Sequence, residues 1–423
     1  MLTVAEARAR VLDAVAPLDE IELPVRKARG FVVVRDLVAP HSIPSFDNSA
    51  MDGYAVIGSN VKAASKAAPV ELEVVGEVRA GDAGDLKVEP GQAARIMTGA
   101  PLPPGADAIV PVEVTSERDG VVSISEASEV GQHVRPAGDD IEGGTTVVRG
   151  GMELGPGELA MLATLGLSPV AVHRRPRVAV LTTGDELVAP EDAPGPGQIR
   201  DSNSVALAAL VAEAGGEVLP FGRVEDTRAA VLDALERAAA EADLVISSGG
   251  VSVGRYDYVK DAVEQLGRID LWRVAMQPGK PVVLGEVRGT TFLGLPGNPV
   301  SIHVGFEQFV RPALRKQRGC RWFLRPEVRA TLTERVTKRP GRLHFVRVRL
   351  DAGEQGWRAT PTGAQGSHIQ SSLVGCHGVA RFDIEDTELD AGDEVVVEVW
   401  RLPDGAESGA TTDDRLDDRG EAT

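Results

Sequence analysis

The chain has 423 residues, of which 43% are apolar and 26% charged, enough for several domains with their own cores. Its formal net charge of −18 argues against nucleic acid and anionic membranes as partners. The two cysteines, Cys320 and Cys376, have no ligand-spaced neighbours, and no apolar run approaches the ~18 residues of a membrane span. We therefore expect a cytoplasmic protein without disulfides, structural zinc or membrane helices.

The N-terminal part of the chain predicts one helix followed by short strands. Residues 3–15 are expected to form a helix, because Thr3 and Glu6 have the spacing of a capping box. From about residue 25 to 141, β-rich runs are separated by Gly-Asp and Pro-Gly turns, which predicts a small β domain. A further helix that ends at a glycine is expected over residues 158–166.

From residue 176 onward, strands and helices alternate. Short apolar runs predict strands at 177–181, 244–246, 282–284 and 291–295. Apolar stripes with helical spacing predict helices at 203–214, 227–242, 257–266 and 299–314. This alternation predicts a parallel sheet with helices on both faces.

The last hundred residues have a different pattern. Beyond Cys320, β-rich runs predict a separate all-β domain, with strands at 328–332, 344–350 and 394–399. From residue 404 to the end there are seven acidic and two basic residues and no apolar periodicity, so a disordered acidic tail is expected.

Polar loops directly follow three of the predicted α/β strands, at residues 182–187, 247–254 and 295–301. Ligands of open α/β sheets bind at the carboxyl ends of the strands, so these loops are expected to form one site. The glycine-rich second loop suits a phosphate, because backbone N–H groups without Cβ atoms can approach it closely; a purely steric turn is the competing interpretation. The loop matches neither Walker A nor G-x-G-x-x-G, which disfavours a P-loop kinase and a Rossmann dehydrogenase.

Charged residues near these loops allow two interpretations. Glu186 and Asp257 follow neighbouring strand ends, where they either cap helices or hold Mg²⁺ against substrate phosphates. Arg273, Lys280 and Arg342 are candidate cations for an anionic ligand, or ordinary surface charges. No nucleophile–His–Asp arrangement is legible, so a serine or cysteine hydrolase is not proposed.

Five segments together resemble the MoeA family of molybdopterin molybdenumtransferases, which includes the E domain of gephyrin. The first is Asp-Asn-Ser-Ala-Met-Asp-Gly-Tyr-Ala at residues 47–55. The others, in family order, are Arg-Ile-Met-Thr-Gly-Ala-Pro at 95–101, Thr-Gly-Asp-Glu-Leu at 183–187, Ser-Ser-Gly-Gly-Val-Ser-Val-Gly at 247–254 and Pro-Gly-Asn-Pro-Val-Ser at 296–301. The resemblance extends over about residues 1–402.

The resemblance implies a multidomain α/β plus β fold containing an α/β module similar to MoaB and MogA. The implied parts are a discontinuous N-terminal domain (1–48 and 142–176), a small β domain (49–141), a molybdopterin-binding α/β domain (177–320), a C-terminal β domain (321–402) and the disordered acidic tail (403–423). It also implies a homodimer whose active cleft lies between the α/β module of one subunit and the first domains of the other.

The implied reaction is adenylyl-molybdopterin plus molybdate giving molybdenum cofactor and AMP, with Mg²⁺. Matching positions imply catalytic roles for Asp52, Thr98, Glu186, Asp226 and Asp257, with Glu186 and Asp257 as the metal ligands. Pterin, phosphate and adenylate binding is expected from Thr183, Gly184, Ser248, Gly249, Gly250, Ser252, Gly254, Lys280, Pro296, Gly297, Asn298 and Pro299. Oxyanion binding is expected from Arg273, Arg342, Ser367 and Ser371.

One position departs from the family pattern: Gln277 stands where some members have lysine, which puts the strength of molybdate binding in doubt.

Three alternatives to this function remain open. A molybdopterin adenylyltransferase shares the α/β module but lacks the Asp52 motif, and a CinA-like nucleotide hydrolase leaves residues 47–55 unexplained. A catalytically silent scaffold, as in gephyrin's clustering role, predicts degraded carboxylates, which are intact here. Docking of an adenylyltransferase and the choice between molybdate and tungstate are also open.

Overall fold

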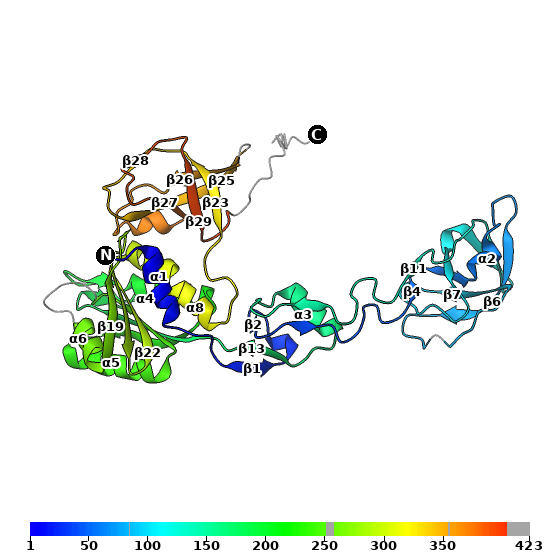
Figure 1. Ribbon diagram of the computed structural model, residues 1–423, viewed down its shortest axis with the longest axis horizontal. Helices are drawn as coiled ribbons and strands as arrows, with labels where there is room; N and C mark the ends of the chain where they lie inside the picture. The colour runs from blue at the N-terminus through cyan, green and yellow to red at the C-terminus, as the bar shows by residue number, and fades with distance from the viewer. Residues whose placement is uncertain (84, 251–257, 354–355, 404–423) are drawn as a thin grey trace, which may run out of the picture.

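The computed structural model describes residues 1–83, 85–250, 258–353 and 356–403. Three of the predicted site residues, Ser252, Gly254 and Asp257, and the acidic tail from residue 404 lie outside the described residues. The molecule is elongated (Figure 1): an α/β module and a C-terminal barrel lie together at one end, a small β domain lies at the other, and a few strands and one helix connect them. No helix among the described residues is long and apolar enough to cross a membrane.

The first helix, α1 (Val4–Asp13), begins where its capping box predicts. The Thr3 hydroxyl accepts a hydrogen bond from Glu6 N at 3.2 Å, and the Glu6 carboxylate accepts one from Thr3 N at 2.8 Å. Its apolar face, Val4, Ala7 and Val11, packs into the core of the α/β module. The chain therefore begins in the α/β module and then leaves it.

The connecting part, here called the N-terminal module, is built from segments on both sides of the small β domain. Its three-stranded sheet has the order β1 (Glu20–Leu23), β13 (Val170–His173), β2 (Val32–Val33). Strand β3 (Leu37–Val38) pairs with β12 (Thr146–Val148), and α3 (Pro156–Thr164) covers a core that includes Val33, Leu154 and Leu162.

The small β domain is a six-stranded sheet in the order β8 (Ala108–Pro111), β5 (Gly53–Val56), β7 (Gln92–Ile96), β6 (Val70–Val78), β10 (Val121–Ile124), β9 (Thr115–Arg118). A short helix, α2 (Gly58–Val61), and a two-stranded pair, β4 (Asn48–Ser49) with β11 (Val134–Arg135), complete it. Two apolar clusters, one on each side of β5 and β7, form its core.

The α/β module is a six-stranded sheet in the order β17 (Glu217–Val224), β14 (Arg177–Thr183), β18 (Leu244–Ser248), β22 (Thr290–Leu295), β21 (Pro281–Val287), β19 (Gly267–Arg273). The expected parallel arrangement holds for the first four strands, whereas β21 runs antiparallel to both of its neighbours, β22 and β19. Only Arg288 and Gly289, both with positive φ, connect β21 to β22. A two-residue turn cannot carry a parallel crossover, so the strands form a hairpin.

Helices cover both faces of this sheet. On one face, α5 (Arg228–Glu241) and α6 (Tyr258–Leu266) pack on Val245 and Phe292. The other face is covered by α1, α4 (Ser202–Glu213), α7 (Pro299–Gly305) and α8 (Arg311–Gln317). The single helix predicted over 299–314 is thus interrupted by a π-helical turn, Phe306–Val310. A short ribbon, β15 (Leu187–Val188) with β16 (Ile199–Arg200), precedes α4.

The C-terminal domain is a closed barrel in the order β20 (Met276–Gln277), β25 (Leu343–Gly353), β26 (Gly356–Pro361), β23 (Glu327–Leu332), β29 (Glu394–Val399), β27 (Gly378–Phe382), with β27 returning to β25. A small pair, β24 (Val336–Thr337) with β28 (Glu388–Leu389), flanks it. Strand β20 leaves the α/β module to pair with β25, so the two domains share a sheet edge.

Candidate functional site

The three predicted loops meet at the carboxyl edge of the parallel strands β14, β18 and β22. Gly249 N donates to Leu295 O at 3.0 Å, which joins the second loop to the third. A Cβ on Gly249 would lie 3.2 Å from Thr183 O, so the first loop is also in contact. Gly250 has φ +65°, and a Cβ there would lie 2.3 Å from Val259 Cγ2, so only glycine fits. The described parts of the three loops therefore lie side by side at this edge of the sheet.

The N-terminus of α4 holds these loops together, a role that the sequence interpretation missed. Thr182 Oγ1, which is fully buried, donates to Asp201 Oδ2 at 2.6 Å, and Asp201 Oδ1 caps α4 by accepting from Ser204 N at 3.0 Å. Asn203 Nδ2 donates to Ser248 Oγ at 3.1 Å and to Gly297 O at 2.8 Å. The N-cap residue before a helical stripe was the available signal for Asp201.

Acidic side chains gather beside the first loop. Gly184 has φ +146°, and a Cβ there would lie 2.6 Å from Glu186 Oε2, so the Glu186 carboxylate lies over this glycine. Partial burial, and then the charges of Asp185 and Glu186, raise the pKa of Asp226. Repelling carboxylates of this kind are stabilised by a divalent cation. The described residues contain no preformed group of three metal ligands, and Asp257 lies outside them.

A cavity of about 380 Å³ lies between the α/β module and the barrel. The α/β module contributes Lys280, Pro296, Asn298 and Ser301, among others, and the barrel contributes Arg342, Gln365, Gly366 and Ser367. Asn298 Nδ2 donates to Ser367 Oγ at 3.2 Å, and Val300 N donates to Ser367 O at 3.2 Å. These two hydrogen bonds join the α/β-module wall of the cavity to its barrel wall. Among the described residues, neither Lys280 nor Arg342 has a carboxylate partner. The cavity therefore offers two unpaired cations and a hydroxyl to an anion.

Two of the four predicted oxyanion residues do not line this cavity. Arg273 is exposed at the end of β19, and Ser371 is exposed on the turn Gln370–Leu373. Gln277, the position that departs from the family pattern, does line it, next to Pro278. Lys280, Arg342 and Ser367 thus line one shared cavity, whereas Arg273 and Ser371 lie outside it.

A fully buried arginine behind the cavity was also missed. Arg347 Nε donates to Ser372 Oγ at 3.1 Å, and its Nη2 donates to Gly366 O at 3.3 Å. Its backbone N donates to Gln365 Oε1 at 2.9 Å. Burial lowers the pKa of Arg347 to about 10, and its Nη1 has no partner among the described residues. Arg347 therefore holds the loop that brings Gln365, Gly366 and the neighbouring Ser367 to the cavity; a basic residue inside the apolar run 343–350 was its only signal.

Asp52 and Thr98 lie together, but far from these loops. Asp52 Oδ1 accepts hydrogen bonds from Thr98 N and Thr98 Oγ1, both at 2.7 Å, and these bonds lower the pKa of Asp52. Both residues belong to the small β domain, at the opposite end of the molecule from the α/β module (Figure 1). One subunit alone does not bring them to the strand-end loops.

Three family models match consecutive parts of the chain. They are the MoeA N-terminal region (domain I and II) over residues 2–166, a probable molybdopterin binding domain over 179–316, and the MoeA C-terminal region (domain IV) over 329–400. Molybdopterin molybdenumtransferase 2 of Mycobacterium tuberculosis is 41% identical, over 95% of this chain and 100% of that protein. The molybdopterin molybdenumtransferase of Haemophilus influenzae is 37% identical, over 94% of this chain and 98% of that protein.

Solved structures agree with these matches. Two crystal structures of a molybdopterin biosynthesis MoeA protein from Pyrococcus horikoshii have TM-scores of 0.83 and 0.81 to this chain, at 33% and 29% identity. Each alignment covers 95% of this chain and 100% of the other. The expected multidomain α/β plus β fold is confirmed.

Proposed function

The chain belongs to the MoeA family, and from this premise we propose that it inserts molybdenum into adenylyl-molybdopterin, giving molybdenum cofactor and AMP. The observation that carries the proposal is the position of the cavity with Lys280 and Arg342, which shares Pro296 and Asn298 with the strand-end loops. An oxyanion site and a phosphate site then lie side by side, as a transfer between two anions requires.

In this proposal the strand-end loops bind the pterin phosphate and the adenylate. The backbone at Thr183, Gly184, Gly249 and Gly250 offers close approach, and Ser248 and Asn298 offer polar side chains. Pro299 begins α7, whose positive N-terminal dipole adjoins the Pro296–Asn298 turn. The contribution of the protein here is orientation of the dithiolene sulfurs toward the cavity.

The cavity between the α/β module and the barrel is the proposed oxyanion site. Lys280, Arg342 and the Ser367 hydroxyl hold molybdate there, where the two dithiolene sulfurs replace two of its oxygens. One oxygen leaves as water with the two thiol protons, and the other bonds to the adenylate phosphorus as the phosphoanhydride breaks and AMP departs. Gln277 supplies an amide in place of a positive charge, so we expect weaker oxyanion binding than a lysine there would give. Tungstate has the same charge and shape, so both oxyanions belong in the test.

Mg²⁺ is proposed as the metal, held by Glu186 and Asp257 with Asp226 nearby. The raised pKa of Asp226 beside Asp185 and Glu186 supports a cation at this edge of the sheet. The metal would neutralise charge on the phosphoanhydride. Purified chain with adenylyl-molybdopterin, molybdate or tungstate, and Mg²⁺ should release AMP. Glu186→Gln should abolish release and leave the fold intact, whereas Glu191→Gln, an exposed neighbour, should not.

Unchanged AMP release in Glu186→Gln would reject the metal assignment. No release from the unmodified chain with either oxyanion would favour the scaffold alternative. The adenylyltransferase alternative predicts formation, not cleavage, of the adenylylated pterin from ATP, so supplying molybdopterin and ATP separates the two reactions. The match to the MoeA N-terminal region, which includes Asp52, supports the insertion reaction.

A homodimer is proposed to complete the site, because Asp52 and Thr98 lie far from the loops of their own subunit (Figure 1). Mixing Asp52→Asn and Glu186→Gln subunits tests this arrangement. Each variant alone lacks an intact site, but a mixed dimer has one site with both residues native, so random mixing should restore about a quarter of the sites. No recovery in mixed dimers, verified by differential tagging, would place all catalytic residues within one subunit.

We place the reaction in the cytoplasm, where a biosynthetic adenylate and Mg²⁺ are available and where two buried free thiols are stable. An adenylyltransferase that delivers the adenylylated pterin is the proposed protein partner. Co-purification of the two enzymes, with and without bound pterin, would test it.

A further inference from the structure

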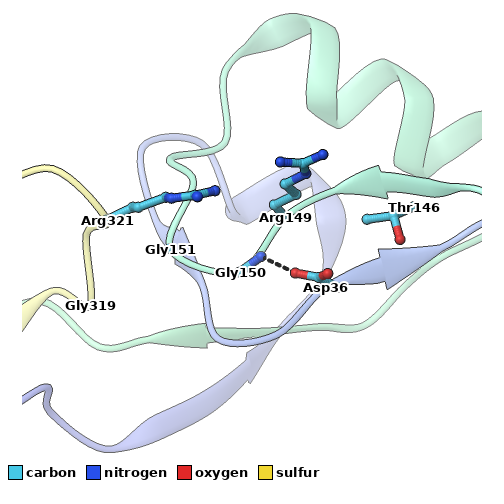
Figure 2. A pocket seen from close by; sticks show the side chains of 7 residues that line it. All are labelled: Asp36, Thr146, Arg149, Gly150, Gly151, Gly319 and Arg321. Carbon is cyan, nitrogen blue, oxygen red and sulfur yellow. Dashed lines mark hydrogen bonds between the residues drawn. The ribbon is translucent and has the colours of Figure 1, made fainter.

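The N-terminal module meets the α/β module at the end of α8, next to a cavity of about 590 Å³ (Figure 2). One wall is formed by Asp36, Arg149, Gly150 and Gly151, and the other by the segment from Gly319 to Arg321. Gly150 N donates to Asp36 Oδ1 at 2.8 Å, and Arg321 N donates to Gly151 O at 2.9 Å. The junction thus borders a cavity on one side, and the Arg321–Gly151 hydrogen bond crosses it there.

Arg318, which is 4% exposed, binds both modules at once. Its Nη1 donates to Ala214 O, the C-cap of α4 in the α/β module, at 3.0 Å. Its Nη2 donates to Gly30 O in the N-terminal module at 2.7 Å and forms an ion pair with Glu153 Oε2 at 3.1 Å. The planar guanidinium makes these contacts in fixed relative directions, which a lysine ammonium cannot do.

Two glycines make the close packing around Arg318 possible. A Cβ on Gly215 would lie 2.4 Å from the Arg318 guanidinium carbon. Gly319 has φ +71°, and a Cβ there would lie 2.1 Å from His173 Cδ2. Gly215 therefore leaves space for the guanidinium, and Gly319 leaves space for the ring of His173 in the N-terminal module.

A second anchor joins the same two modules. Arg174, at the exit of β13, forms a bidentate pair with Asp243, both distances being 2.7 Å. Asp243 also accepts from Arg177 N at 2.8 Å, at the start of β14. Two anchors restrict both bending and twisting of a junction that a single contact would leave free.

We propose that Arg318 is a positioning residue that fixes the angle between the N-terminal module and the α/β module. The proposal rests on the proposed function, in which Asp52 and Thr98 act on the loops of the partner subunit. The small β domain lies at the end of a long arm (Figure 1), so a small rotation at Arg318 becomes a large displacement of Asp52. A misplacement of about 1 Å at a catalytic group can cost about a hundredfold in rate.

The test measures the junction and the reaction separately. Dyes are attached to two introduced cysteines at exposed positions, Ala127→Cys in the small β domain and Ala229→Cys on α5. In sparsely labelled dimers, the distance between the two dyes reports on the angle at the junction. The native cysteines, Cys320 and Cys376, are buried. Arg318→Gln and Arg318→Lys should both broaden the distance distribution. Glu153→Gln, a milder change at a half-exposed partner, should broaden it less. Arg149→Gln, which lines the cavity without joining the modules, is the matched control.

In the full-length enzyme, Arg318→Gln and Arg318→Lys should lower kcat for AMP release by at least about tenfold, with KM for adenylyl-molybdopterin within about twofold and the dimer mass unchanged. Failure of the lysine variant to rescue separates the guanidinium geometry from its charge. An unchanged distance distribution in both Arg318 variants, or a broadened one with native kcat, would overturn the proposal. Absence of AMP release in the unmodified enzyme would reject the proposed function instead, while the distance measurement still decides whether Arg318 fixes the junction.

Discussion

Replacing Asp201 by alanine removes two hydrogen bonds at the base of the strand-end loops. The α4 cap that it provides to Ser204 N is worth about 1 kcal/mol. The Thr182 hydroxyl, fully buried, would lose its acceptor at 2.6 Å, and an unsatisfied buried hydroxyl costs about 1–3 kcal/mol. We therefore expect Asp201→Ala to destabilise the loop edge by roughly 2–4 kcal/mol.

Thr182→Val separates these contributions, because it keeps the side-chain shape. Alone, it leaves the buried Asp201 carboxylate without its donor, at a cost of about 1.5–3 kcal/mol. In the double variant neither partner is left unpaired, so the combined cost should fall below the sum of the single costs by about 1–3 kcal/mol.

Hydrogen exchange of the β14 and β18 amides, read by mass spectrometry, measures these costs locally. Local exchange is needed because a multidomain chain does not unfold in one two-state step. The control is Thr290→Val, which removes the hydrogen bond from Thr290 Oγ1 to Ala239 O at the start of β22, at the opposite end of that strand from the loops. Single costs that add within about 0.5 kcal/mol would refute the coupling of Thr182 to Asp201.

Other consequences concern the remaining polar contacts. Thr98→Val should raise the pKa of Asp52, because both hydrogen bonds that lower it come from Thr98 and the hydroxyl bond is lost; carboxyl NMR titration measures this, and an unchanged pKa would contradict it. Arg347→Met should lower the stability of the barrel by at least about 2 kcal/mol, because its hydrogen bonds to Ser372 and Gly366 are lost. It should also weaken molybdate binding while pterin affinity stays the same, which isothermal calorimetry with each ligand would measure. An equal loss of affinity for both ligands would argue against a role confined to the barrel loop. Burial first, then nearby cations, lower the pKa of His344 to about 4. Since its ordinary pKa is about 6.5, the unfolded chain binds the proton first: stability is full above about pH 6.5 and falls by about 3 kcal/mol by pH 4. Acid unfolding of the barrel should lose this slope in His344→Phe.

Features that depend on neighbouring residues could be predicted from the sequence. The Thr3–Glu6 capping box placed α1, and the polar residues after apolar runs placed the loops at 182–187 and 295–301, because caps and strand ends depend on neighbours within a few residues. The Arg288-Gly289 turn was equally local, and its two residues signal a hairpin, so the antiparallel β21–β22 pair was open to prediction.

Contacts between segments far apart in the chain could not be predicted from the sequence. Nothing in residues 4–13 specifies that their apolar face packs on the α/β module, since any apolar surface would satisfy the stripe. The pairing of β20 with β25 joins residues about 67 positions apart and sets the wall of the oxyanion cavity. The role of Arg347 could not be predicted either, because its partners Gly366 and Ser372 come from a loop with no periodicity and meet Arg347 only in the folded barrel.

The acidic composition of the chain and the anionic substrates proposed for it are compatible because of where the cations lie. Many arginines of the described residues pair with carboxylates, as Arg325 does with Glu307 at 2.9 Å, and so contribute little field beyond their partner. Lys280 and Arg342 have no such partner among the described residues, and Arg347 is buried behind them without one. Lys280 is exposed, but Arg342 is half-buried and Arg347 fully buried. A buried or half-buried cation without a counter-ion is costly until an anion arrives, so binding an oxyanion beside these two arginines relieves a cost that the fold already carries. The net charge of −18 disfavours anions over the molecule as a whole, and the cations of this cavity offset that repulsion locally.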